Sequence, residues 1–591
     1  MQTLASNTTA DYNTGVGSQT LYTNTSGTEN TGIGYAALQL NTTGSYNVAV
    51  GRNALAANTT ASDNTALGKG TLESNTTGTG NVAVGKAALD SNTTGSYNTS
   101  IGRSSMDLNV TGSNNTAVGY QSLRDNTTTN NTAFGYQALR LTSTGANNTG
   151  LGLQTLNANT TGTGNVAVGH QTLDANTTGN NSVAVGMDAL GSNTTGLENT
   201  AVGYKALELN TTGNYNVAVG RSCLDEHTSG TYNNAFGYAA LHSTTSSSYN
   251  VGLGSYALAS NTTGSRNIAV GFYALYAQTG TDDNIGIGYY SGADITSGAY
   301  NIGVGRESNR QVTTGPHNTA IGYQANFGTT TGGNNTIVGS GAFTNNTSGS
   351  DNTAIGYQAL RAANSPSDNT CIGSYAGTAI TTGAENTFVG HVAGDVCTTG
   401  ERNTGVGREA LTKVTTGTGN TSIGRAAGED ITTGSNNLLL GTDAGRSGSP
   451  SGSLTSHDHI CVLGNNSITA LYCADTSIDS SDSRDKTDIA DFTHGLNWVN
   501  QLKPKTYRWD KRSWYADNTP DGSKKRNKKH IGFLAQDVLT IEGNPSDKDD
   551  MLVVNLNEDN TAYGIKYARL VPVLVNAIKE LSTKVTALEA K

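Results

Sequence analysis

The chain repeats itself every seventeen residues over most of its length. A motif of the form Asn-Thr/Val-Ala-Val/Ile-Gly ends in a glycine that recurs 26 times between Gly17 and Gly441. Every interval is seventeen residues except the one between Gly119 and Gly135, which is sixteen. Self-similarity at a short fixed period is typical of a solenoid, in which neighbouring repeats bury each other's faces. Positions are counted below from this glycine, so that +4 is the fourth residue after it and −1 the residue before it.

The composition of one repeat indicates β structure. Seventeen residues are too few for two helices and a turn, and the alternation Val48-Ala49-Val50 predicts a short strand. The Asn-Thr-Thr-Gly stretch and the Asn-rich joint predict turns with room for positive φ. With 75 Gly and 7 Pro but no three-residue period, the sequence is not collagen, and 35% hydrophobic residues are too many for plain disorder. We therefore expect a mainly β chain, with a lead-in at 1–10 and a β-roll or β-solenoid of 26 coils at 11–444.

One row of large apolar residues is expected to form the core. Position +4 is Leu in the first sixteen repeats, from Leu21 to Leu275, apart from Met106. In three later repeats glycine takes this place and an isoleucine appears three positions further on, which keeps the core volume constant as close packing requires. These pairs are Gly292 with Ile295, Gly377 with Ile380, and Gly428 with Ile431.

The two faces of the expected strand carry residues of different size. Position −1 is large and apolar, as in Val50 and Phe134, whereas position −2 is nearly always Ala, Ser or Gly, as in Ala49. We expect the large side to fill the coil and the small side to pack against another copy of the chain, because a thin roll buries too little surface alone.

Charge marks a domain boundary near residue 481. The last 111 residues contain 18 Lys and Arg and 16 Asp and Glu, whereas the preceding 480 contain 17 and 29 and are therefore acidic. All three Trp lie in the last segment, which predicts a globular core there. Residues 445–480 break the period and are expected to be a linker and a β neck.

Several classes of site receive little support. His457 and His459 could bind a metal ion on a threefold axis, or they are two exposed loop histidines. The five Cys are odd in number and far apart, so we expect small buried side chains and no disulfide framework.

The first ten residues show neither a signal sequence nor an apolar stretch, and no membrane span is expected. The basic run at 523–530 lies beside Asp517 and Asp521, which favours a solvated loop over a nucleic-acid site.

The repeats resemble those of YadA-like trimeric bacterial adhesin heads and of phage tail fibres. The resemblance covers about three quarters of the chain and implies a homotrimer of left-handed rolls. The adhesin version needs a secretion signal and a terminal membrane barrel. We recognise neither in this sequence, so the phage version is favoured.

Four motifs distinguish the last segment. They are Ser481-Asp-Ser-Arg-Asp-Lys486, Leu502-Lys-Pro…Tyr507-Arg-Trp509, Ile531-Gly-Phe-Leu-Ala-Gln-Asp-Val538 and Tyr567…Leu570-Val-Pro572. In this order they resemble the C-terminal intramolecular chaperone domain of phage endosialidases, tailspikes and fibres, a self-cleaving module also classed as a serine peptidase. The resemblance implies a domain at 481–591 that trimerises, templates the fold of the shaft, and then cuts the bond between Ser480 and Ser481. It also implies that Ser481 and Lys486 are the catalytic pair.

The chemistry of such a pair is plausible on general grounds. A serine hydroxyl becomes a useful nucleophile when a base takes its proton, and a desolvated lysine amine is such a base. Five residues of separation permit a turn that brings Ser481 and Lys486 together. The expected activity is a single autoproteolytic turnover, with no further enzyme activity and no cofactor.

The end of the chain reads as a coiled-coil helix. Large apolar residues follow 3-4-3-4 spacing, which is the pattern of a left-handed coiled coil, although an amphipathic core helix has a similar stripe. We expect these residues to form a trimer seam: Val571, Leu574, Ile578, Leu581, Val585 and Leu588.

These features predict a structural and receptor-binding phage tail fibre. Its expected partners are two further copies, a glycan or protein receptor on the host cell surface, and other tail or baseplate proteins, with neither nucleic acid nor membrane insertion. It would be made in the host cytoplasm and reside in the virion. Rows of Tyr before the strand and after the glycine either stack on surface sugars or cap the roll. The alternatives are a tailspike depolymerase that cuts host glycans with paired carboxylates and a trimeric bacterial adhesin.

Overall fold

The computed structural model describes residues 2–468, 487, 489–515, 517, 519–545, 547, 550–556 and 562–591. The chain divides into two compact units, residues 1–354 and residues 355–591. Repeats occur in both units, and the last segment lies in the second. Each unit is described by itself below.

Each repeat contributes one three-residue strand, and one further strand follows the last repeat. The strands are β1 (Thr14–Val16), β2 (Thr31–Ile33), β3 (Val48–Val50), β4 (Thr65–Leu67), β5 (Val82–Val84), β6 (Thr99–Ile101), β7 (Thr116–Val118), β8 (Thr132–Phe134), β9 (Thr149–Leu151), β10 (Val166–Val168), β11 (Val183–Val185), β12 (Thr200–Val202), β13 (Val217–Val219), β14 (Asn234–Phe236), β15 (Val251–Leu253), β16 (Ile268–Val270), β17 (Ile285–Ile287), β18 (Ile302–Val304), β19 (Thr319–Ile321), β20 (Thr336–Val338), β21 (Thr353–Ile355), β22 (Thr370–Ile372), β23 (Thr387–Val389), β24 (Thr404–Val406), β25 (Thr421–Ile423), β26 (Leu438–Leu440) and β27 (Cys461–Leu463).

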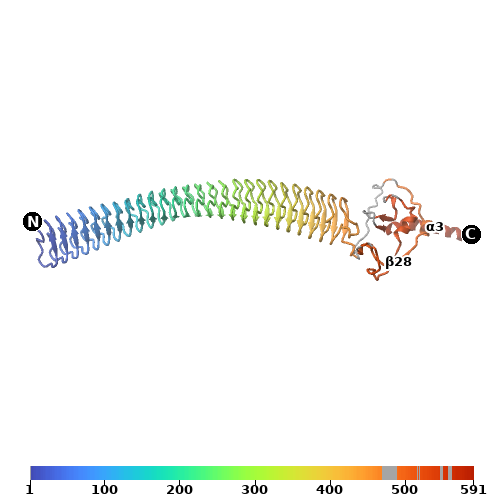
Figure 1. The fold of residues 1–591 in the computed structure, drawn as a ribbon, viewed down its shortest axis with the longest axis horizontal. Helices are drawn as coiled ribbons and strands as arrows, with labels where there is room; N and C mark the ends of the chain where they lie inside the picture. The colour runs from blue at the N-terminus through green and yellow to red at the C-terminus, as the bar shows by residue number, and fades with distance from the viewer. Residues whose placement is uncertain are drawn as a thin grey trace. The chain divides into compact units, whose positions relative to one another are not determined.

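Successive strands pair in parallel and in register. In the first unit β3 pairs with β4 so that Ala49 lies opposite Ala66, and the same seventeen-residue offset recurs between neighbouring strands. In the second unit β22 to β26 pair in the same way, for example Phe388 opposite Gly405, and β26 pairs in parallel with β27 across a longer connection. Figure 1 shows the coils following one another in chain order within each unit. The predicted mainly β solenoid is therefore confirmed.

The leucine row forms the core, as expected. Every +4 residue from Leu21 to Leu275 is fully buried. These residues adopt a left-handed backbone, with φ of 50° at Leu55 and 55° at Leu207. That conformation costs an ordinary residue roughly 1–2 kcal/mol. Full burial of a leucine contributes about 1.5–3 kcal/mol, so burial outweighs the backbone strain in each coil.

The expected exchange of core volume is also present. Gly292 has φ of 60°, which costs glycine nothing, and Ile295 is buried in the same coil. Position +7, which Ile295 occupies, holds a buried asparagine in most earlier coils, such as Asn41 and Asn58. The exchange therefore replaces a polar interior residue by an apolar one where the leucine is lost.

The expected orientation of the strands is wrong. Position −2 points inward, since Ala49 is fully buried, whereas Val48 and Leu67 on the outward side are 39% and 47% exposed. The reason is the narrow interior: a Cβ added at Gly32 would lie 2.7 Å from Thr20 Cγ2 and 3.6 Å from Leu21 Cγ. In coils with leucine at +4 the interior is already filled, so the strand centre there is Gly, Ala or Ser, whereas Ile337, Phe388 and Leu439 are buried at strand centres of later coils. The large apolar side thus faces outward.

The asparagines are interior residues, a role that the sequence analysis did not assign to them. Asn58 Nδ2 donates to Asn41 Oδ1 at 2.7 Å and to Ala61 O at 2.9 Å, and this arrangement recurs from coil to coil. A second row lies beside the strands, where Asn47 Nδ2 donates to Ala61 O and Asn47 Oδ1 accepts from Asn64 N–H. Both rows are fully buried. They supply the interior backbone with hydrogen-bond partners, because buried polar groups left unpaired are costly.

The positive φ angles also differ in place from the expectation. They fall on positions +2, +4 and −5, for example Asn53, Leu55 and Tyr46, and not on the Asn-Thr-Thr-Gly stretch. Glycine is needed in that stretch for another reason. A Cβ at Gly44 would lie 2.2 Å from the carbonyl oxygen of Ala61 in the next coil.

Residues after Gly441 continue the solenoid. β27 pairs with β26, and Thr455 O accepts from Thr432 N–H at 2.7 Å. Leu454 is buried, so the segment expected as linker and neck contains one longer coil. Three described cysteines are buried as expected, but Cys461 is exposed because it occupies an outward position of β27. Cys473 lies outside the described residues.

The last segment forms a small α+β core. Its elements are α1 (Leu496–Val499), β28 (Lys505–Tyr507), η2 (Arg512–Trp514), β29 (His530–Gly532), α2 (Ala535–Ile541), β30 (Val554–Leu556), β31 (Tyr563–Ile565), η4 (Tyr567–Arg569) and α3 (Leu570–Glu589). β28 pairs antiparallel with β29, and β30 with β31. Within the described parts of the chain, no helix has both the length and the apolar character needed to cross a membrane. The buried residues are Trp498, Val538, Met551, Val553, Val554, Leu570 and Val573.

The asparagine rows make a prediction about stability. Asn193 Nδ2 donates to Asn176 Oδ1 at 2.9 Å and to Gly196 O at 3.1 Å, and Asn193 Oδ1 accepts from Asn210. Asn193→Ala leaves these partners unpaired in the interior. Because each unpaired buried group costs roughly 1–3 kcal/mol, we expect the free energy of unfolding to fall by about 2–4 kcal/mol. Urea denaturation followed by circular dichroism measures it. Thr195→Ala, an exposed neighbour, is the control and should change stability by less than about 0.5 kcal/mol. Equal effects of the two substitutions would contradict the role of the row.

Candidate functional site

The predicted catalytic pair cannot be placed. Ser480, Ser481 and Lys486 lie outside the described residues, as does the bond expected to be cut. Their assignment stays a prediction. What the structure does describe is most of the segment that follows them.

The three later motifs of this segment meet in space. β28 from the Leu502…Trp509 motif pairs with β29 from the Ile531…Val538 motif. The backbone N–H of Phe533 donates to Tyr567 Oη at 3.1 Å, which connects β29 to the beginning of the last motif. A Cβ at Gly532 would lie 2.4 Å from Tyr567 Oη and 3.3 Å from Tyr507 Cε1. Glycine at 532 is therefore required by the two tyrosines from the flanking motifs.

The carboxylate of Glu542 fixes a second part of this core. Glu542, at the end of α2, accepts hydrogen bonds from the backbone N–H groups of Leu552, Val553 and Val554 at 3.2, 2.7 and 3.0 Å. Charge-assisted bonds of this kind are roughly twice as strong as neutral ones. The sequence analysis did not single out Glu542, and a lone glutamate after a helix gives no signal that would.

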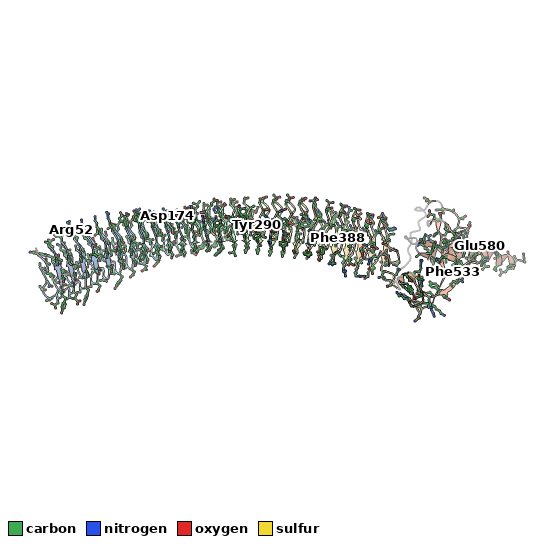
Figure 2. The ribbon with its side chains drawn as sticks, viewed as in Figure 1. Arg52, Asp174, Tyr290, Phe388, Phe533 and Glu580 are labelled. Atoms are coloured by element: carbon green, nitrogen blue, oxygen red, sulfur yellow. The ribbon has the colours of Figure 1, made fainter. Side chains whose placement is uncertain are left out.

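Helix α3 presents different faces to its own core and to solvent. Leu570, Val573 and Ala577 are buried against the core. Asn576 Nδ2 donates to Phe492 O at 2.6 Å, and Leu496 N–H donates to Glu580 Oε2 at 3.2 Å. These contacts fix the first half of α3 to the segment before α1. Figure 2 labels Glu580 and Phe533 in this part of the chain.

The predicted seam residues form the solvent face of α3. Ile578 is 65% exposed and Leu588 is 70% exposed, and from Ile578 onward every side chain of the helix is exposed. The core contacts use a separate stripe, so the 3-4-3-4 pattern is not explained by the core of one copy. The exposed set consists of Val571, Leu574, Ile578, Leu581, Val585 and Leu588.

The basic run of this segment packs on aromatic rings. The Arg526 guanidinium lies 4.9 Å from the ring centre of Trp514, and Lys524 Nζ lies 5.2 Å from that of Tyr515. Arg526 N–H also donates to Trp509 O at 2.9 Å. Part of the positive charge thus serves contacts within the chain.

The outward side of the solenoid strands is an apolar surface. In the first unit, Leu67, Leu151 and Leu253 at position −1 are 47%, 43% and 46% exposed, and position −3 adds residues such as Val48 and Val183. Because position −1 is large and apolar in every coil, the apolar surface is continuous along the strands, and position −3 widens it where it is Val, Ile or Leu. A contiguous apolar surface of this kind usually marks an interface.

Tyrosines before the strands stack on one another. Tyr215 and Tyr232 have ring centres 4.8 Å apart with an interplanar angle of 7°, and Tyr249 follows at 5.3 Å. Tyr300 stacks similarly on His317. A neighbouring coil therefore covers ring faces of these four tyrosines, which favours the capping interpretation for them, whereas Tyr12 and Tyr97 at the same position are 84% and 66% exposed.

Carboxylates also follow one another from coil to coil. The pKa of Asp90 is raised to about 6 by burial and by the charges of Glu73 and Asp107. Burial and a hydrogen bond with Glu208 likewise raise the pKa of Asp225 to about 6, and His242 Nε2 lies 3.6 Å from Asp225 Oδ2. Asp174, Asp188 and Glu208 line a shallow depression of about 370 Å³.

The histidine pair is built into the last coil. Asp458 Oδ1 accepts from Ser435 N–H at 2.7 Å, and His459 N–H donates to Ser435 O at 3.1 Å. His457 is half-buried and its carbonyl oxygen accepts from Asn437 Nδ2. No cluster of three or more His, Cys, Asp or Glu side chains suited to a metal ion occurs among the described residues of this single chain.

The comparison with protein families finds one match. The model of the family described as chaperone of endosialidase matches residues 481–545. The match begins at Ser481, at the predicted cleavage site, and includes α1, β28, β29 and α2. Searches of curated proteins and of solved structures found no match. A long β-solenoid followed by this chaperone match fits a fibre-like protein with a C-terminal chaperone.

The contact between Gly532 and Tyr567 makes a prediction about the chaperone segment. Gly532→Ala places a methyl group against Tyr567 Oη. We expect this overpacking to lower the free energy of unfolding by about 1–3 kcal/mol. Gly532→Ala combined with Tyr567→Phe removes the clashing oxygen and should recover part of that loss. The double-mutant cycle is measured by denaturation of the full chain, with Tyr567→Phe alone as the reference. Additive effects would show that the two residues do not touch.

Proposed function

We propose that this chain is the subunit of a homotrimeric phage tail fibre that attaches to the surface of a bacterial host. Its C-terminal segment, 481–591, drives trimeric folding and then cuts the chain between Ser480 and Ser481. The observation that carries this proposal is the chaperone match at 481–545 placed directly after a long solenoid. The family is associated with trimeric assembly.

The exposed stripe of α3 supports the trimer. Six large apolar side chains at coiled-coil spacing face solvent in one copy, and a helix half without contacts to its own core is marginal in water. Three such stripes facing one another bury these residues together. The seam residues Val571, Leu574, Ile578, Leu581, Val585 and Leu588 keep this role as part of the proposal.

The outward side of the strands supports contact along the shaft. Position −1 is large and apolar in every coil, and position −3 is Val, Ile or Leu in some coils and Thr in most others. These apolar side chains need cover if the shaft is to stay soluble. A second and a third copy offer the same surface with the same repeat. The interface of the shaft is therefore the large-residue side of the strand, the reverse of the side expected from residue size.

The cutting step uses the Ser481 hydroxyl and the Lys486 amine. Lysine removes the serine proton, and the serine oxygen attacks the carbonyl carbon of residue 480. The peptide bond breaks as an ester forms between this carbonyl carbon and the Ser481 oxygen, and the lysine ammonium returns the proton to the departing amine of Ser481. Water then hydrolyses the ester, which leaves a carboxylate on Ser480 and restores the Ser481 hydroxyl. Lysine acts as a base only when water is largely excluded around it, so cleavage follows assembly.

The proposed fibre resides in the virion after synthesis in the host cytoplasm. Its other partners are a glycan or protein receptor and the tail or baseplate proteins that hold it. Neither the adhesin alternative nor nucleic-acid binding is part of the proposal.

A tailspike depolymerase remains the second candidate because of one observation. Glu208 and Asp225 are neighbouring carboxyls, and the pKa of Asp225 is raised to about 6, as in a general acid. Release of reducing ends from bacterial capsule, lost in Asp225→Asn, would favour this function over attachment alone.

Removal of the nucleophile tests the cutting step. Ser481→Ala should leave a full-length chain that still forms trimers, whereas the unchanged chain should release a fragment of 111 residues. Lys486→Ala should block cleavage as well, and Ser483→Ala is the control that should not. Intact-mass measurement and light scattering give both readouts. Cleavage of Ser481→Ala at the same bond would exclude this serine as the nucleophile.

A charge in the seam tests the chaperone role. Leu581→Asp introduces three carboxylates into the proposed helix interface, so we expect uncut, insoluble chain, because strand edges of the unassembled solenoid pair at random. Ser582→Asp adds the same charge one position away from the stripe and should assemble normally. Solubility, trimer content and cleavage are measured together. Normal trimers from Leu581→Asp would refute the seam.

A further inference from the structure

One part of the solenoid surface carries a dense set of aromatic side chains. Three consecutive coils, which begin at Gly254, Gly271 and Gly288, all have tyrosine at position +2; the last two add an aromatic residue at +1, and the middle one adds a tyrosine at +5. We call this set the aromatic patch. Figure 2 labels Tyr290 within it. Its members are Tyr256, Phe272, Tyr273, Tyr276, Tyr289 and Tyr290.

The rings form two columns that run from coil to coil. Tyr273 and Tyr290 stack at 5.1 Å with an interplanar angle of 7°, and Arg310 lies 4.5 Å from the centre of Tyr290. In the second column Phe272 and Tyr289 stack at 5.7 Å, and Arg306 lies 5.6 Å from the centre of Tyr289. Each column thus ends under a guanidinium, and the rings are held in place by their neighbours.

The patch remains accessible at its ring edges. Phe272 and Tyr289 are 41% and 46% exposed, and the Arg306 side chain is 60% exposed. Leu275 and Ser291, which follow patch residues in the chain, lie across the interior from the strand centre. A Cβ added at Gly286, a strand centre, would lie 2.8 Å from Leu275 Cγ and 3.0 Å from Ser291 O. The patch directly follows the strands in the chain, and its side chains stay accessible in one copy.

The solenoid itself does not need aromatic residues at these positions. Tyr256, Tyr273 and Tyr290 occupy position +2 with φ of 60°, 55° and 55°, which is an uncommon conformation for a bulky residue. Other coils hold glutamine there with the same backbone, and those amides bond to each other, as between Gln137 and Gln121 at 3.1 Å. Because the coil forms equally with glutamine, folding alone gives no reason for the three tyrosines.

The chemistry of the patch fits an uncharged sugar chain. Phenol hydroxyls and the exposed Arg306 guanidinium lie beside apolar ring edges, and sugars present hydroxyls beside apolar C–H groups. The nearby charges nearly balance, since Arg310 faces Asp294 and Glu307, and the Arg306 guanidinium lies 3.6 Å from Glu307. A polyanion would therefore find little net attraction. Within the patch the rings follow one another at the spacing of the coils, which suits a short stretch of a polymer of repeating units.

We propose that the aromatic patch is a binding site for an uncharged glycan chain of the bacterial surface. This inference rests on the proposed attachment function and gives it a place and a ligand class. The glycan chain lies along the columns. The tyrosine hydroxyls and Arg306 donate hydrogen bonds to sugar oxygens, and the ring edges cover the apolar faces of the sugars.

Replacement of the tyrosines by the residue that other coils use tests the site. The variant Tyr256→Gln/Tyr273→Gln/Tyr290→Gln keeps a side chain proven at position +2, so it should fold and form trimers. The control Tyr120→Ser/Tyr136→Ser removes a stacked pair at position +1 elsewhere, where Ser255 and Ser340 occur naturally. Full-length protein is applied to an array of uncharged and anionic bacterial oligosaccharides. We expect the unchanged chain and the control to bind uncharged oligosaccharides, and the triple variant to bind more than about tenfold more weakly.

The outcomes separate this proposal from the attachment function. Equal binding by the triple variant, or a preference for anionic oligosaccharides, overturns the glycan site. Attachment to periodate-oxidised bacteria without any array binding also overturns it, because the partner is then a protein, and leaves attachment intact. Trimers that attach to none of a broad panel of bacterial strains contradict the attachment function itself.

Discussion

The hydrogen bonds between successive coils are the interaction on which the solenoid depends. Nearly all strands pair with the strand seventeen residues away, and the backbone between strands also bonds to the next coil, as in Leu55 N–H to Thr71 O. Once that offset is fixed, every inward side chain meets its own counterpart in the next coil. A leucine therefore packs on leucine, and an asparagine donates to asparagine. The period of the sequence follows from this condition.

The same condition makes the coil too thin to be self-sufficient. Its interior holds one leucine, a few small residues and two asparagines, and nothing larger than a methyl group fits at most strand centres. The large apolar residues at −1 and −3 consequently remain outside. The positions that directly follow the strand carry polar and aromatic residues, so they differ from the strand side in what they can bind. The strand side suits another copy of the chain, and the aromatic positions suit a ligand.

The sequence predicted what depends on periodicity and failed where orientation was needed. The strands, the leucine row and the exchange between Gly292 and Ile295 follow from spacing, and all are present. The direction of Ala49 did not follow, because alternation shows that two faces differ but not which one faces a core of limited width. The asparagines were assigned to turns on residue preference, whereas Asn41 and Asn47 are buried hydrogen-bond partners. In the last segment the seam stripe was found from heptad spacing, but Gly532 and Glu542 act through contacts over distances that no short motif reveals.

A repetitive shaft creates a register problem that its own sequence cannot solve. If three chains meet along the strand side, a shift of one chain by one repeat replaces each residue by a similar one, so that correct and shifted alignments differ little in energy. Only a segment outside the repeat distinguishes them. The last segment is such an element, since its core, its helix α3 and its charge distribution occur once in the chain. If its three helices associate first, their alignment sets the register of the coils before them. The position of a chaperone match beside the end of a solenoid thus has a physical reason in the near-identity of the repeats.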